Sequence, residues 1–107
     1  MSELERCRKE IDAIDEQLLK LLNERAEWAV RAGRWKKTNH QPVWQPDREL
    51  QILHHVEQSN PGPLDNAAIR RLFERIIDEA RSLERHIVSE SGPQPQADAG
   101  PAGREKE

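Results

Sequence analysis

Residues Leu4 to Lys36 read LERCRKEIDAIDEQLLKLLNERAEWAVRAGRWK, with no proline and no glycine before Gly33. Apolar side chains recur along this stretch at alternating spacings of three and four, which predicts one helix with an a/d stripe. The stripe consists of Leu4, Cys7, Ile11, Ile14, Leu18 and Leu21, and Trp28, Ala32 and Trp35 continue it. At ~1.5 Å per residue the helix is roughly 50 Å long, so the shorter elements that follow cannot cover it. The pattern therefore indicates a partner helix from a second chain.

A cation interrupts this stripe, because Arg25 stands where an apolar residue is expected. Lys36 follows 11 residues later, about 20° around the helix axis and ~16 Å along it, so both cations point the same way. Between them the same face carries Ala29, Ala32 and Gly33, which are small. Two long cationic side chains over a floor of small residues leave room for a compact dianion. The helix is therefore predicted to form the wall of an anion-binding site.

Arg8 precedes Arg25 by 17 residues, or ~25 Å along the helix, so the two cannot reach one small ligand within one chain. In an antiparallel dimer, the partner's Arg8 would approach the Arg25 of this chain. Two simpler interpretations stay open from the pattern alone. Arg8 and Lys36 would then be solvated helix charges, and Arg25 would set the helix register through a buried ion pair.

The composition limits the class of protein. The chain has 107 residues, which is the size of one small domain, with 35% charged and 4% aromatic residues and no tyrosine. Its net charge of −3 provides no overall basic field for nucleic acid or an anionic membrane. Cys7 is the only cysteine, which excludes an internal disulfide and fits a reducing cytosol. With no long apolar run and no signal-peptide pattern, we expect a soluble, cytoplasmic protein.

The remainder of the chain predicts two further helices. The first helix has Ser2 as a candidate N-cap and should end near residues 37–38. A proline-containing loop follows, in which Val43 and Trp44 are expected to pin the chain to the core. A short helix is predicted over residues 46–58, and a third helix from an Asp65 N-cap to about residue 89.

These elements predict an all-α fold, with one long, one short and one long helix in each chain of an intertwined homodimer. The helical domain should cover residues 1–90. Residues 91–107 are rich in proline and glycine and nearly without large apolar groups. Such a segment cannot offset its ordering entropy, so we expect a disordered tail.

The third helix also carries one residue of the wrong type on its apolar stripe, Glu84. A carboxyl on such a face needs either a cation as partner or a proton. The basic residues of this helix alternate with acids, so they are interpreted as a solvated, ion-paired face rather than an RNA-binding surface. These are Arg70, Arg71, Arg75, Arg81 and Arg85.

Several other kinds of site are not indicated. His54 and His55 are adjacent and would point about 100° apart on a helix, so they do not predict a metal site. The sequence has no glycine-rich phosphate loop and no nucleophile elbow. What remains is a set of cations with one or two carboxyls, without a cofactor. Such a site can bind a dianion in a reactive conformation and stabilise charge that develops in a rearrangement.

Four motifs together resemble the all-helical chorismate mutases, over roughly residues 4–87. They are Arg8-x-x-Ile11-Asp12-x-Ile14-Asp15-x-x-Leu18-Leu19-x-Leu21-Leu22-x-x-Arg25, Gly33-x-x-Lys36, Pro42-Val43-x-x-Pro46-x-Arg48-Glu49 and Asn60-Pro61-Gly62-Pro63-Leu64. The resemblance implies two interlocked chains of three helices, with two active sites built from both chains. It also implies the Claisen rearrangement of chorismate to prephenate, in phenylalanine and tyrosine biosynthesis, without a cofactor or a covalent intermediate.

The resemblance also implies roles for the site residues. Arg25 and the partner's Arg8 would clamp the two substrate carboxylates, and Lys36 would donate to a carboxylate and to the ether oxygen. Arg48 would line the site, and Glu49 would accept the ring hydroxyl. Glu84 falls where family members have a glutamine or glutamate that donates to the ether oxygen.

Two positions depart from the family pattern. Ala80 stands where some members have a serine that touches the substrate, and Gln45 where some have aspartate. Each change affects one secondary polar contact, worth ~1 kcal/mol. The cations Arg25 and Lys36 are unaffected.

Other functions remain open on this scaffold. Isochorismate–pyruvate lyases and aminodeoxychorismate mutases share the cation set, and Glu49 favours chorismate over their substrates. The alternative of another class is a non-catalytic helical dimerisation module. An interaction with a partner enzyme of the same pathway also stays open.

Overall fold

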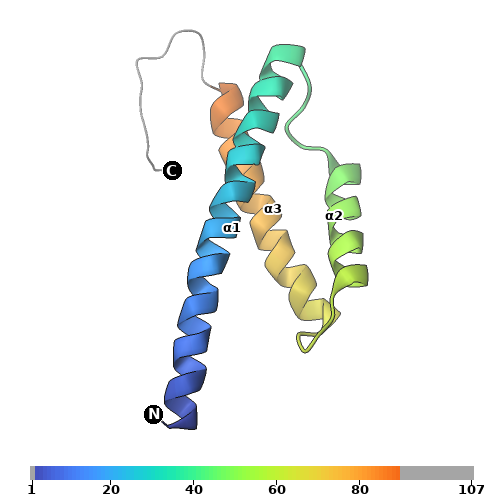
Figure 1. The fold of residues 1–107 in the computed structure, drawn as a ribbon. Coiled ribbons are helices and arrows are strands. Elements are labelled where there is room, and N and C mark those ends of the chain that lie inside the picture. The colour runs from blue at the N-terminus through green and yellow to red at the C-terminus, as the bar shows by residue number, and fades with distance from the viewer. Residues whose placement is uncertain (1, 90–107) are drawn as a thin grey trace.

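The computed structural model describes residues 2–89, and within this part of the chain every regular element is an α-helix. The helices are α1 (Glu3–Asn39), α2 (Pro46–Ser59) and α3 (Asn66–Ser89). Figure 1 shows α1 as the longest helix, with α3 crossing it and α2 lying to one side. The predicted order of one long, one short and one long helix is confirmed. The predicted tail, residues 91–107, lies outside the described residues.

The helix ends follow the local sequence. Ser2 caps α1 in a capping box: its side chain accepts from the Glu5 backbone N–H, and the Glu5 carboxylate accepts from the Ser2 N–H. The helix ends at His40 in the left-handed conformation, slightly later than predicted. Pro46 occupies the first turn of α2, and the Asp65 side chain accepts from the Ala68 N–H at 2.8 Å ahead of α3.

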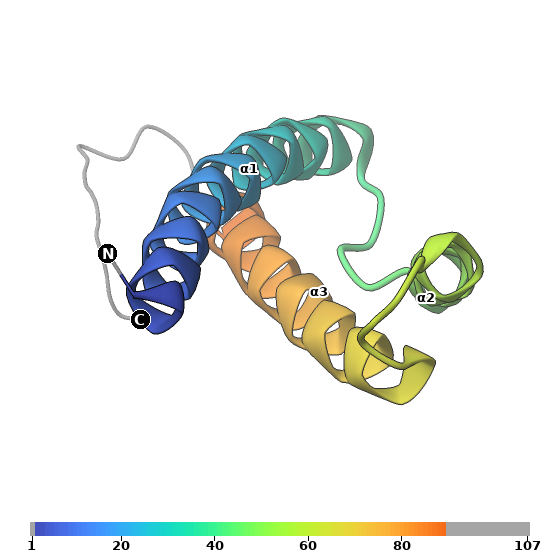
Figure 2. The same cartoon turned by 60° about the horizontal axis from the view of Figure 1, so that its bottom comes forward.

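α3 is the central packing element. It packs against both α1 and α2, whereas the backbones of α1 and α2 stay apart throughout residues 2–89. The view in Figure 2 shows α3 crossing α1 obliquely, with α2 separated from α1. The most buried apolar side chains are Leu53 of α2 and Ile77 of α3. The position of α2 relative to α1 is therefore set through α3 and the connecting loop.

Gly33 allows the close crossing of α1 and α3. A Cβ at this position would lie 3.3 Å from the Glu84 Cα and 3.4 Å from its Cβ. Because glycine lacks that atom, the α3 backbone can approach α1 directly at this point. The crossing brings Glu84 onto the face of α1 that carries Lys36.

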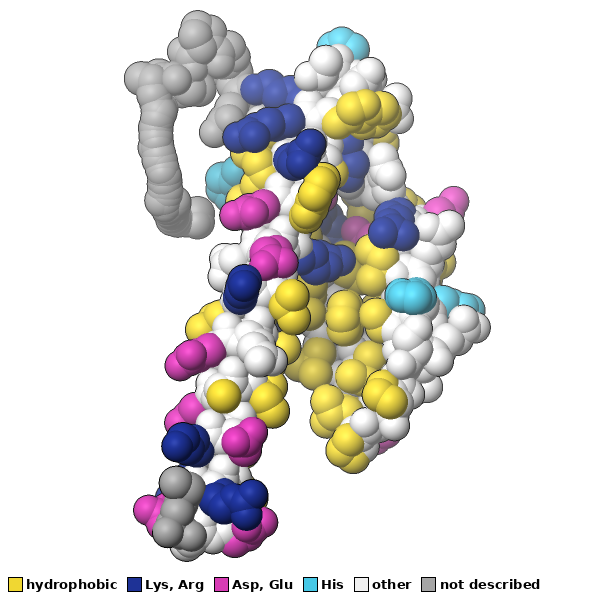
Figure 3. Space-filling view, viewed as in Figure 1, with side chains coloured by type: hydrophobic (Ala, Val, Ile, Leu, Met, Phe, Trp, Pro, Cys, Tyr) yellow, Lys and Arg dark blue, Asp and Glu magenta, His cyan; other side chains and the backbone are white. Residues whose placement is uncertain are grey.

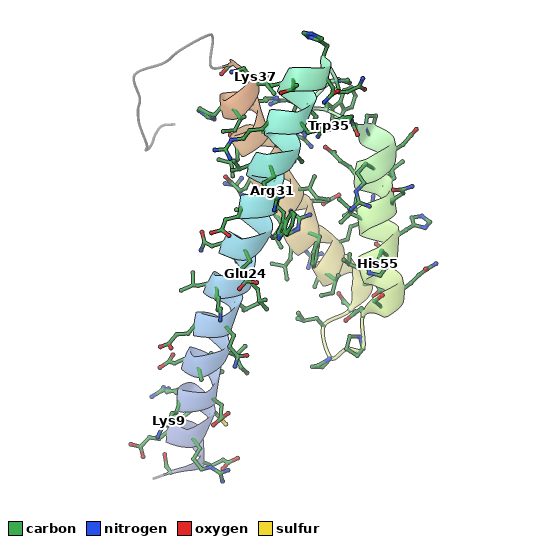
Figure 4. All side chains as sticks on the ribbon, turned by 45° about the horizontal axis from the view of Figure 1, so that its top comes forward. Lys9, Glu24, Arg31, Trp35, Lys37 and His55 are labelled. Carbon is green, nitrogen blue, oxygen red and sulfur yellow. The ribbon has the colours of Figure 1, made fainter. Side chains whose placement is uncertain are left out.

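The N-terminal half of α1 extends beyond α2 and α3. Figure 1 shows it standing alone, and Lys9, labelled in Figure 4, lies on it. Its large apolar side chains are about half exposed in the single chain; they are Leu4, Ile11, Ile14, Leu18, Leu19, Leu21 and Leu22. No helix among residues 2–89 combines the length and apolar character that crossing a membrane requires.

The three tryptophan side chains are all exposed in the single chain. Trp44 is 59% exposed, so the prediction that it pins the loop to the core is wrong, whereas Val43 is partly buried. Trp28 and Trp35, which continue the stripe of α1, are also exposed. The Arg31 guanidinium lies 4.3 Å from the centre of the Trp28 ring, a cation–π distance. A single chain does not supply the surface that these rings would pack against.

Candidate active site

A cavity of about 950 Å³ opens between the C-terminal half of α1, the loop that follows it, α2 and α3. Figure 3 shows this hollow between α1 and α2, with basic and acidic side chains inside it. Its charged lining residues are Arg25, Lys36, Asp47, Arg48, Glu49, Arg81 and Glu84. Small and apolar residues form much of the remaining wall, among them Ala29, Ala32, Val43, Ile52, Ile77 and Ala80. Ala29 and Ala32 of the predicted floor therefore line the cavity, whereas the third member, Gly33, lies at the α3 crossing instead.

Lys36 and Glu84 form an ion pair at the centre of this wall. Lys36 Nζ lies 2.5 Å from Glu84 Oε1, and it also donates to the Val43 carbonyl oxygen at 3.3 Å. The two side chains are only 15% and 12% exposed. Glu84 thus has the cationic partner that its place on an apolar stripe requires. The pair is formed across the α1–α3 crossing, between residues 48 positions apart.

Arg25 projects into the same cavity from the middle of α1. Burial lowers the pKa of its guanidinium, the neighbouring Arg48 lowers it further, and Glu84 opposes this shift. Arg48 itself is exposed and donates to the Gln51 side chain at 3.5 Å. Two cations close enough to perturb each other, with one of them partly desolvated, form a local positive potential. This positive potential favours the binding of an anion and does little to stabilise the chain when no anion is bound.

Glu49 and Arg81 form a second ion pair in the cavity wall. The Arg81 Nε and Nη2 atoms each donate to one oxygen of the Glu49 carboxylate at 2.9 Å. The Arg81 and Glu49 side chains are 21% and 22% exposed. Arg81 is ion-paired as predicted, but the prediction that it lies on a solvated face is wrong, because its main partner lies on α2 in the cavity wall. Spacing along one helix cannot reveal a partner on another helix.

Of the three remaining predicted site residues, two line the cavity and one lies outside it. Gln45 lines the cavity and donates to the Pro42 carbonyl oxygen at 3.2 Å, and Ala80 lines it as well. Arg8 is exposed on the free half of α1 and is not part of the cavity wall of its own chain. A single chain therefore does not bring Arg8 and Arg25 together, as their spacing predicts.

The chemistry available in this cavity is electrostatic. The residues that line it include no serine, threonine, cysteine or histidine. Among residues 2–89, no group of three or more histidine, cysteine, aspartate or glutamate side chains could hold a metal ion. Four cations and three carboxyls line the cavity, so four minus three leaves one net positive charge. The wall can bind, orient and polarise an anion.

The fold and the site together define a class of all-helical proteins with a charged cavity between the long helix and the two helices that follow it. The chain belongs to the chorismate mutase type II family, whose model matches residues 7–85. It is similar to solved chorismate mutases. That of Thermus thermophilus (Form II) has a TM-score of 0.77 and 32% identity, covering 78% of this chain and 96% of that one. That of Helicobacter pylori, solved in complex with prephenate, has a TM-score of 0.75 and 28% identity, covering 83% and 97%.

Among curated relatives, the chain is similar to bifunctional chorismate mutase/prephenate dehydratases. The Neisseria gonorrhoeae protein is 39% identical over 88 residues, which are 81% of this chain and 24% of that protein. The Aquifex aeolicus protein is 40% identical over 98 residues, which are 87% of this chain and 27% of that protein. The chain thus spans about a quarter of the length of these relatives.

Proposed function

We propose that this chain catalyses the rearrangement of chorismate to prephenate in an active site that two copies of the chain share. The observation that carries the proposal is the convergence of Arg25, Lys36, Arg48, Glu49 and Glu84 on one cavity. These are the residues for which the sequence motifs imply contact with chorismate. The similar Helicobacter pylori enzyme was solved with prephenate, which supports a dianion of this size in the corresponding cavity.

The proposed mechanism uses position and charge alone. Arg25 and Arg8 of the partner subunit would clamp the two substrate carboxylates, with Arg48 lining the site, so that the two ends of the molecule lie close enough to form the new carbon–carbon bond. As the carbon–oxygen bond breaks, negative charge grows on the ether oxygen. The Lys36 ammonium and a protonated Glu84 would donate hydrogen bonds to that oxygen and stabilise the transition state more than the substrate.

We propose a homodimer because one chain is incomplete in two respects. The apolar stripe on the free half of α1 is exposed over several turns, a feature that marks interaction surfaces. Arg8, which the family resemblance places at the substrate, is also absent from the cavity of its own chain. Arg8 of the partner subunit would supply this second clamp. One packing of two α1 helices would cover the stripe and deliver this arginine.

The activity is tested by following chorismate consumption by ultraviolet absorbance on the purified protein and identifying the product. Prephenate is the expected product. Formation of pyruvate and salicylate from isochorismate, with no turnover of chorismate, would instead identify an isochorismate–pyruvate lyase. An aminodeoxychorismate mutase would act on the aminated substrate. A dimer that consumes none of these substrates would be a non-catalytic module.

The shared site is tested by mixing an Arg8→Ala chain with an Arg25→Ala chain. Each homodimer lacks one clamp in both sites, whereas the heterodimer regains one site with both arginines. Random exchange of subunits should restore about a quarter of the wild-type activity, because half of the dimers are mixed and each has one intact site. If subunits exchange and activity stays at the level of the single variants, the two arginines do not serve one site.

We also propose a partner enzyme that consumes prephenate, because the similar bifunctional proteins carry a prephenate dehydratase on the same polypeptide. Sedimentation of this chain mixed with the prephenate dehydratase of the same organism should show a complex. Independent sedimentation of the two proteins at micromolar concentrations would refute a stable association.

A further inference from the structure

The ion pair between Arg81 and Glu49 is the one strong contact in the cavity wall that the proposed mechanism leaves unused. It joins α3 to α2 across 32 residues, and both of its hydrogen bonds are 2.9 Å long. An arginine fork that meets both oxygens of a carboxylate fixes the carboxylate in plane and in rotation. The Glu49 carboxylate also raises the pKa of Arg81, and Asp78 adds to this effect. The guanidinium is therefore a permanent cation at this place.

The local partner of Arg81 on α3 is the weaker one. Asp78 lies 3.2 Å from Nη2, but its side chain is 55% exposed, whereas that of Glu49 is 22% exposed. An exposed pair within one helix contributes little, and a bidentate pair shielded from water contributes more. Arg81 is thus held toward the cavity by Glu49 rather than toward solvent by Asp78.

The contact between Arg81 and Glu49 matters because α2 is held in place through its contacts with α3. The backbone of α2 contacts α3 but not α1 within the described residues, so the cavity wall that α2 provides depends on its contacts with α3. Glu49 lies in the first turn of α2, next to the loop that lines the cavity. Without a fixed partner, its side chain could turn among several rotamers, and its negative charge would repel a dianionic substrate.

We propose that Arg81 is a positioning residue that fixes and neutralises Glu49, so that this carboxylate can accept the ring hydroxyl of the substrate without repelling its two carboxylates. The inference rests on the proposed function. An ionised carboxylate offers about four acceptor sites, and the two bonds from Arg81 leave one on each oxygen. Glu49 can therefore keep Arg81 and accept a hydroxyl at the same time. Arg81 acts through Glu49 and selects for a substrate that carries the hydroxyl.

The test compares chorismate with an analogue that lacks the ring hydroxyl. Arg81→Ala should lower kcat/KM for chorismate about tenfold, mostly through KM. The analogue should lose less, because it meets the repulsion of the unneutralised Glu49 carboxylate but makes no hydroxyl contact with it. Arg81→Lys keeps the charge but loses the fork, so it should fall between the wild type and Arg81→Ala. Arg75, which pairs with Glu79 on the exposed face of α3, is the matched control, and Arg75→Ala should leave both substrates unaffected.

A double-mutant cycle supplies the second measurement. If Arg81 acts through Glu49, then Glu49→Gln should raise KM for chorismate in the wild-type background and have little effect, or lower KM, in the Arg81→Ala background. A merely structural role predicts equal losses on both substrates and additive effects of the two substitutions. Equal losses of kcat/KM on the two substrates, or additive effects of the two substitutions, would overturn the proposal. A direct contact of Arg81 with a substrate carboxylate would also overturn it. Thermal unfolding monitors the fold, and Arg81→Lys provides the measurement if Arg81→Ala does not fold.

Failure of the proposed function gives a different result. A wild-type protein that turns over neither chorismate nor the analogue would remove the proposed function and this inference together. A wild-type protein that converts chorismate, with no change in substrate preference in the Arg81 variants, would remove only the role of Arg81.

Discussion

Replacing Glu84 by glutamine should keep a hydrogen-bond donor beside the ether oxygen of the substrate, whereas replacing it by alanine should remove that donor. In the structure the Glu84 carboxyl lies 2.5 Å from Lys36 Nζ and is 12% exposed, in the wall that faces the substrate. Glutamine keeps an oxygen that can accept from Lys36 and adds an amide N–H that donates at any ordinary pH. A carboxyl can donate to the ether oxygen only when it carries a proton.

The expected effect on the rate follows from this difference. Glu84→Gln should keep or raise kcat/KM, because its amide N–H can donate in the transition state. Glu84→Ala removes the donor and should lower kcat by about 10²–10³, the usual cost of losing one transition-state donor.

The stability of these variants provides the control. Glu84→Gln loses the ion pair but keeps a charge-assisted hydrogen bond with Lys36, so it should cost about 1–2 kcal/mol. Glu84→Ala leaves a largely buried ammonium with the Val43 carbonyl as its remaining acceptor, and should cost about 3 kcal/mol. kcat/KM is measured by chorismate absorbance, and stability by thermal unfolding. A loss of kcat/KM in Glu84→Gln as large as that in Glu84→Ala would remove the side chain at position 84 from hydrogen-bond donation and leave Glu84 as the structural partner of Lys36.

Three further substitutions test other parts of the structure. Arg25→Ala should lower kcat/KM more than Arg48→Ala, because water can replace the exposed Arg48 more easily than the partly buried Arg25; equal losses in steady-state kinetics would contradict this ranking. Gly33→Val should destabilise the fold by about 1–3 kcal/mol and lower activity, because its branched side chain meets the α3 backbone at Glu84; an unchanged melting temperature would show that the helices separate freely. The pKa of Glu5 lies below its ordinary value because the carboxylate accepts from the Ser2 N–H. This hydrogen bond therefore stabilises α1 at pH values above the pKa that Glu5 has in the unfolded chain, and the stabilisation is lost as pH falls through the pKa that Glu5 has in the folded chain. Circular dichroism should show that the start of α1 frays at acid pH. The change with pH should be smaller in Glu5→Gln.

Local sequence patterns were sufficient to predict the helices and the unusual members of their stripes. Periodicity, caps and prolines are local features, so the three helices end within a few residues of their predicted bounds. Arg25 and Glu84 could be singled out for the same reason, because a charge at an apolar position is visible within one helix. The distance between Arg8 and Arg25 also follows from helix geometry alone.

Which residues face one another across helices depended on the packing of the whole chain. The pairing of Lys36 with Glu84 depends on how closely α3 approaches α1 at Gly33, and that of Arg81 with Glu49 on how α3 is tilted toward α2. Trp44 was misjudged because an aromatic residue in a loop is buried only if neighbouring elements cover it, and within the described chain none covers it fully. Helix periodicity assigns a residue to a face, but the crossing of helices depends on side-chain packing along their whole contact. That packing is a property of pairs of helices, which no single stretch of sequence contains.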